Sequence, residues 1–410
     1  MYIMNQLKTI TRDFQKCLAV TPLPIISLML YLGLKSTTIL PDGGMHEFNG
    51  MYHPAYLGWY DFVLGYSIIF SFITGILKLE LKDLVFGLTL LFIISASWTG
   101  TYEQDKDFII AGIVCYLRFF LVFVFAKSLV YRLGYRAAES VLVVAYGVLS
   151  ANAVLWYSLQ FGIQNRMAAS AMTSPSFGQV SAILCLIFYS KKYYPFLFYS
   201  FIFLFLTFSR TSLLLFLIIL VIQNRKIIPW NLFKYVAIFA VLAAVGIMLM
   251  TQYGGQATEV VLESRFSFDE ISNLNGRSSQ WIDALEAIET RHMPIFGIGF
   301  HMSPSLIEDA NIKYFRGYGL GFYIPPHFHN IIVEYALGLG VLSLIIFFYL
   351  IKRIVQTFRH HYTTAFFVFT FFLISQTLDY TFNAPKEIIV FSLMLGLAEG
   401  QWRSKEQLEK

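Results

Sequence analysis

Long apolar runs, separated by short polar segments, follow one another along almost the whole chain. A bilayer core about 30 Å thick needs roughly 20 apolar residues per helix. Twelve runs approach that length: 21–40, 57–77, 84–98, 108–130, 138–161, 176–190, 193–208, 211–224, 233–251, 329–351, 363–382 and 386–401. An open sheet would leave backbone groups unpaired in hydrocarbon, and the period-2 alternation of a membrane barrel is absent. The pattern therefore predicts an all-α polytopic membrane protein with about 12 transmembrane helices.

Composition supports this class and excludes others. Hydrophobic residues make up 57% of the chain and charged residues only 13%, whereas soluble proteins carry about 25% charged residues. A soluble cytosolic enzyme, a disordered protein and a nucleic-acid binder are therefore excluded. The net charge of +5 does not indicate a nucleic-acid partner, because membrane proteins collect Lys and Arg for topological reasons.

Lys and Arg are distributed unevenly between alternate loops, which predicts the orientation of the spans. With a cytoplasmic N-terminus, 19 of the 30 Lys and Arg fall in cytoplasmic segments, among them Lys127, Arg353 and Arg403. Nine fall in outer loops, and Lys35 and Arg118 lie inside spans. The positive-inside rule therefore predicts twelve spans with both termini in the cytoplasm.

One polar stretch, residues 252–328, is far longer than the others and faces outward in this topology. It divides the chain into residues 1–251 with spans one to nine, the large periplasmic loop, and residues 329–410 with the last three spans and a cytoplasmic tail. From Trp281 onward, apolar residues recur at i, i+3, i+4 and i+7, which predicts an amphipathic helix in the loop. Loops of this length usually carry function, so we expect the chemistry there.

Two outward arginines are candidates for binding an anion. Arg210 lies in a short polar patch between two apolar runs, and arginine near hydrocarbon normally has an anionic partner. We favour a bound anion because the position opposes the positive-inside bias, although a side chain that reaches the interface from a tight turn also fits. Arg277 precedes the loop helix, whose N-terminus suits phosphate, while pairing with Asp283 or Glu286 explains it equally well.

Three residues near the outer ends of spans could contribute to a reaction. His329, followed by Asn330, begins the tenth span, and a histidine there can act as a general base near neutral pH. Asn330 would orient it or donate to a substrate hydroxyl, but an interfacial histidine is often simply amphipathic. Asp379 in the eleventh span either pairs with an arginine or faces water. Arg118, deep in the fourth span, is either its partner or extends toward the interface.

Several motifs are absent, and their absence limits the chemistry. The chain has no GxxxxGK[ST], GxGxxG or HExxH motif, and its DxD match, Asp105-Lys106-Asp107, does not supply a metal cage by itself, so we expect neither a metal nor a cofactor. An enzyme of this kind that acts on phosphate esters would have to neutralise their charge with arginine.

The order of these elements resembles the bacterial O-antigen ligase and O-antigen polymerase superfamily, over about residues 160–400. The resemblance is carried by Ser209-Arg210-Thr211, Gly276-Arg277-(x)3-Trp281, Pro294-(x)2-Gly297-Ile298-Gly299-Phe300, and His329-Asn330-(x)9-Gly340-(x)2-Ser343. The ligase signature ends in Gly, Thr or Tyr where this chain has Ser343. Asn165-Arg166 and Asp379 also fall where related proteins often carry Arg and Asp.

The resemblance implies an inverting, metal-independent glycosyltransferase at the periplasmic face of the bacterial inner membrane. Its donor is a glycan linked to undecaprenyl diphosphate, and a ligase passes that glycan to a sugar hydroxyl of lipid A-core. Arg210 and Arg277 would hold the diphosphate and His329 would take the acceptor proton. The further substrate-binding residues would be Arg166, Arg265, Asn330 and Asp379.

Two other functions stay open. An O-antigen polymerase has the same chemistry, but its acceptor is a second carrier-linked glycan, and the near-complete His-Asn signature favours the ligase. A non-enzymatic transporter of lipid-linked glycans is disfavoured, because the chain shows no inverted repeat with paired broken helices. In each case the partners are lipid-linked glycans and membrane lipids.

Overall fold

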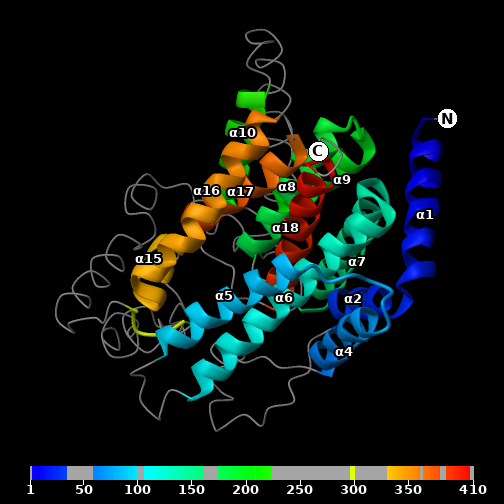
Figure 1. The fold of residues 1–410 in the computed structure, drawn as a ribbon. Helices are drawn as coiled ribbons and strands as arrows, with labels where there is room; N and C mark the ends of the chain where they lie inside the picture. Colours follow the sequence, from blue (N-terminus) through cyan, green and yellow to red (C-terminus); the bar gives the residue numbers. More distant parts are fainter. Residues whose placement is uncertain are drawn as a thin grey trace, which may run out of the picture. The chain divides into compact units, whose positions relative to one another are not determined.

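A computed structural model describes residues 2–34, 59–98, 106–160, 174–207, 209–223, 296–300, 330–360, 363–378 and 385–406. Within these ranges every regular element is a helix, which confirms the all-α prediction (Figure 1). The chain forms two compact units, each described here by itself. The first comprises Met1–Val148 and Ser279–Lys410, and the second comprises Leu149–Ser278.

Apart from α1, which precedes the first predicted span, the helices overlap the predicted spans wherever the described residues allow the comparison. The first unit contains α1 (Tyr2–Val20), α2 (Pro22–Gly33), α4 (Trp59–Ile73), α5 (Leu81–Ser97), α6 (Lys106–Leu133), α15 (Ile331–Leu339), the 3-10 helix Gly340–Leu342, α16 (Ser343–Arg359), α17 (Thr363–Leu378) and α18 (Pro385–Glu406). The second contains α8 (Ser174–Ser190), α9 (Tyr194–Leu206) and α10 (Arg210–Gln223), while α7 (Tyr135–Gln160) belongs to both. The predicted span 233–251 lies outside the described residues.

Three described helices are long and apolar enough to cross a membrane: Gly112–Leu133, Tyr135–Leu155 and Ile331–Arg359. The bent pair Met4–Val20 and Pro22–Gly33 makes a fourth if it counts as one span. Several other helices are apolar but shorter, at 10–17 residues. The chain is therefore an integral membrane protein. The count of twelve spans, the large loop and the orientation stay predictions.

Two helix breaks depart from the simple span pattern. α1 and α2 meet at an angle of 116°, because Pro22 opens α2 and a proline cannot continue the hydrogen bonding of the preceding helix. The predicted span 329–351 is interrupted at Gly340, whose φ of +59° is a conformation that glycine adopts without strain. Helix α16 then extends to Arg359, eight residues beyond the predicted end.

The C-terminal helix α18 packs along α6 (Figure 1). Two glycines of α18 make this close approach possible. A Cβ added at Gly396 would lie 2.3 Å from the Phe123 carbonyl oxygen, and one at Gly400 would lie 2.8 Å from the Val130 Cβ. Small residues at such positions allow two helix backbones to meet inside a membrane.

Candidate functional site

Helix α15 is fixed at its first turn by Asn330. The Asn330 Oδ1 accepts hydrogen bonds from the backbone N–H groups of Ile332 (2.8 Å) and Val333 (3.3 Å). A side chain in this position caps the helix by satisfying amides that have no partner within it. The cap occupies the oxygen of Asn330, so the side chain can offer a substrate only its Nδ2–H groups.

The far end of α15 is bound by the segment Phe296–Phe300. The Ile298 and Gly299 amides donate to the carbonyls of Leu337 and Gly338, each at 2.9 Å. Gly297 has φ +79°, and a Cβ there would lie 2.4 Å from the Leu337 oxygen. The Gly297-Ile298-Gly299 turn therefore satisfies the last carbonyls of α15, and its first glycine is required by both conformation and space.

A cavity of about 180 Å³ lies within the first unit, bounded by helices α5, α6 and α15 to α18. Phe300, Ile331 and Tyr335 line it beside the Phe296–Phe300 segment, and Tyr349 lines it farther along α16. None of the described residues that line it carries a charge. An engineered apolar cavity of about 150 Å³ takes up benzene rather than water, so this space suits hydrocarbon.

Arg210, in the second unit, is the first residue of α10. Ser209 precedes it, and the Ser209 hydroxyl accepts from the Ser212 amide at 3.4 Å and pairs with the Ser212 hydroxyl at 2.7 Å. Gly178 of α8 lets this turn approach closely, because a Cβ there would lie 2.8 Å from the Ser209 Cβ. Arg210 is half-buried, and its charge lies at the positive end of the helix dipole, a location that suits an anion.

Arg118 has a partner that sequence reasoning missed. Its Nε and Nη2 donate to the two carboxylate oxygens of Asp61, at 2.6 and 2.8 Å, and Tyr31 donates to the same carboxylate at 3.1 Å. The arginine and aspartate side chains are 4% and 7% exposed, so the pair is a buried, bidentate ion pair. The pair with Asp61 replaces the interpretation that Arg118 extends toward the interface, whereas Asp379, the other partner suggested from the sequence, lies outside the described residues. The sequence does contain a signal for this pair, because Asp61 is an acidic residue inside the apolar run 57–77.

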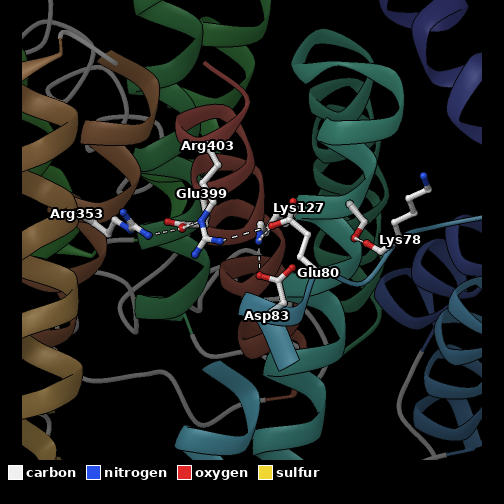
Figure 2. Close-up of polar contacts among 8 residues, drawn as sticks. Lys78, Glu80, Asp83, Lys127, Arg353, Glu399 and Arg403 are labelled. Atoms are coloured by element: carbon white, nitrogen blue, oxygen red, sulfur yellow. Dashed lines mark hydrogen bonds and ion pairs between the residues drawn. The ribbon is translucent and has the colours of Figure 1, made fainter. Parts of the chain in front are cut away.

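Another cluster of charges joins α18, α6, α16 and the start of α5. Figure 2 shows its six side chains. They are Lys127, Arg353, Arg403, Glu80, Asp83 and Glu399. The three bases had been assigned to cytoplasmic segments from the charge bias, but all of them lie within helices. They occur there because acids on neighbouring helices compensate their charge.

The contacts within this cluster form one connected network. Lys127, which is fully buried, pairs with Asp83 and, at 3.3 Å, with Glu80. Glu399 accepts from Arg353 and from Arg403, each at 2.6 Å, and Arg403 lies 3.7 Å from Glu80. Three positive and three negative groups balance, so the cluster ties helices together and does not attract an anion.

Most of the predicted site residues lie outside the described residues. These are Arg166, Arg265, Arg277, His329 and Asp379, together with the loop helix that begins at Trp281. Arg210 and Asn330 are described but belong to different units. The roles of all seven residues therefore stay predictions.

The helices and buried ion pairs define an integral membrane protein with a hydrocarbon-lined cavity. Residues 195–348 match the family model described as O-antigen ligase. The matched segment includes α9, α10, the Phe296–Phe300 segment, α15 and the start of α16. Members of this family are enzymes that transfer lipid-linked glycans. No curated protein matches the chain.

Proposed function

We propose that the protein is an O-antigen ligase. It moves a glycan from undecaprenyl diphosphate to a sugar hydroxyl of lipid A-core at the periplasmic face of the inner membrane. The family match over residues 195–348 carries this proposal, because it contains the near-complete signature His329-Asn330-(x)9-Gly340.

The reaction is an inverting displacement without a metal. His329 removes the proton of the acceptor hydroxyl, whose oxygen attacks the anomeric carbon from the face opposite the diphosphate. The bond from that carbon to the diphosphate oxygen breaks, and the leaving group keeps the electron pair. Arg210 and Arg277 stabilise the negative charge that develops there, and the fork of an arginine suits two phosphate oxygens.

The other predicted residues complete the substrate site. Arg166 and Arg265 add positive charge near the diphosphate, while Asn330 and Asp379 bind sugar hydroxyls. The apolar cavity beside Phe300 and Ile331 supports a lipid-linked donor, because it accommodates part of an isoprenoid chain without burying a charge.

The last position of the ligase signature also has a structural explanation. The Ser343 hydroxyl donates to the Gly340 carbonyl at 2.7 Å and closes the turn between α15 and α16. A threonine hydroxyl can make the same bond, so serine keeps the contact that the threonine form of the signature allows. An O-antigen polymerase is the second candidate, since it differs only in its acceptor.

Sizing the lipid-linked glycans of a strain that carries His329→Ala tests this proposal. A general base contributes about 10²- to 10⁴-fold in rate. We expect long polymer on the undecaprenyl carrier and bare lipid A-core. Lipid A-core that bears one repeat would instead indicate a polymerase, and single repeats held on the cytoplasmic leaflet would indicate a transporter.

The two arginines are tested with purified donor. Arg210→Ala and Arg277→Ala should each raise the barrier by about 3–4 kcal/mol, the usual cost of losing one donor that stabilises an oxyanion. Lysine should rescue poorly because it lacks the planar fork. The control is Arg132→Ala, at an exposed arginine of α6. Full activity in both outer alanine variants would contradict the diphosphate role.

A further inference from the structure

The backbone of Phe300 is bound by two side chains about 200 positions earlier in the chain. Its N–H donates to the Ser97 hydroxyl at 3.0 Å. Its carbonyl accepts from the indole Nε1–H of Trp98 at 2.9 Å. Ser97 ends α5 and Trp98 follows it directly. These two residues, with the Phe300 backbone between them, are here called the Phe300 clamp.

The clamp adds a second attachment to the Phe296–Phe300 segment, which is also bound to α15. Ile298 and Gly299 donate to the end of α15, as described above, so three successive amides are committed to two different helices. The Phe300 ring also packs edge-on against Tyr335 of α15, with ring centres 6.0 Å apart. The segment therefore joins the end of α5 to the end of α15.

The local environment makes this attachment specific. Ser97 is 1% exposed, and its hydroxyl hydrogen is used on the Ile94 carbonyl at 2.7 Å. Its oxygen is thus oriented to accept from Phe300. Gly112 of α6 leaves the room that the clamp needs, since a Cβ there would lie 2.7 Å from the Trp98 ring and 3.2 Å from the Phe300 ring.

We propose that Ser97 and Trp98 are positioning residues for glycan transfer. They hold the Gly297–Phe300 turn in place, and that turn holds α15, the helix that begins just after His329-Asn330. Neither side chain is assigned a contact with substrate. Both lie outside the family match of residues 195–348, so the N-terminal half of the chain contributes to the geometry of the site. This inference rests on the proposed function.

The test compares Ser97→Ala and Trp98→Phe with a matched control on the same helix. The control is Ser95→Ala, because Ser95 is exposed and only two residues away. Misplacement of a reactive group by about 1 Å can cost about 100-fold in rate. We expect kcat to fall about 10- to 100-fold in both clamp variants, with the donor KM within about twofold of wild type. Ser97→Thr keeps the hydroxyl and should recover most of kcat.

Amide hydrogen exchange separates a positioning role from a general loss of structure. Exchange should rise at Ile298, Gly299 and Phe300 in the clamp variants and stay at the wild-type rate in α17 and α18. Wild-type kcat in both variants would overturn the inference, and so would a loss of activity that merely follows the folded fraction. If the wild-type chain transfers no glycan at all, the proposed function itself fails, and the clamp has no such reaction to position.

Discussion

The buried ion pair between Lys127 and Asp83 should contribute strongly to the stability of the first unit. Lys127 is fully buried and the Asp83 side chain is 4% exposed. Replacement by methionine keeps most of the side-chain volume but leaves the Asp83 carboxylate buried without its cation. Removing one partner of such a pair typically costs about 3–5 kcal/mol. We therefore expect Lys127→Met to lower the free energy of unfolding by about that amount.

Two further variants isolate the charge from other effects. Lys82→Met changes the same residue type on α5, next to Asp83, but its side chain is exposed. It should change the free energy of unfolding by less than about 0.5 kcal/mol. Adding Asp83→Asn to Lys127→Met removes the stranded charge, so the double variant should recover much of the lost stability.

The assay is unfolding of purified protein in mixed micelles by increasing SDS, followed by near-ultraviolet circular dichroism. It is run on wild type, on the single variants Lys127→Met, Lys82→Met and Asp83→Asn, and on the double variant. A coupling free energy above about 1 kcal/mol between positions 83 and 127 supports the argument. Wild-type stability in Lys127→Met, or strictly additive losses in the double variant, would refute it.

Two other predictions concern helix packing and metals. Gly396→Ala should destabilise the protein by about 1–3 kcal/mol, because the new methyl group meets the Phe123 carbonyl at 2.3 Å, a backbone atom. Gly147→Ala, with open space around it, should be neutral or slightly stabilising in the same SDS titration. Transfer activity should survive EDTA, because the sequence has no HExxH motif and its DxD match, Asp105-Lys106-Asp107, lies outside the family match of residues 195–348. Activity lost on chelation and restored by Mg²⁺ or Mn²⁺ would contradict this.

Helix positions follow from hydropathy because the bilayer imposes one rule on every span. The backbone must satisfy its own hydrogen bonds, so an apolar run of sufficient length has one available structure. For this reason α5, α6 and α7 begin and end within about three residues of the predicted runs or extend slightly beyond them. The bend before Pro22 could not be predicted in this way, since composition does not give the angle between two helices.

The partners of the buried charges could not be predicted from the sequence in the same way. Arg118 and Asp61 are 57 positions apart, and a single sequence does not show that α4 and α6 place them together. The positive-inside rule counts Lys127 and Arg403 as topological signals. It does not distinguish a lysine in a loop from one buried beside an acid at the end of a helix. What the sequence did offer was the presence of acids such as Glu399 within apolar runs, and each of these implies a partner.

The spacing of the family signature, in contrast, has a direct physical meaning in the structure. Asn330 caps α15, α15 is nine residues long, and Gly340 ends it with a positive φ. The nine positions between Asn and Gly are therefore the length of one helix. Val341 and Leu342 complete the 3-10 helix that begins at Gly340, and Ser343 closes it through its bond to Gly340. The signature therefore encodes a helix of fixed length, held at one end by its cap and at the other by the Gly297–Phe300 turn, and the predicted base, His329, directly precedes that cap in the sequence.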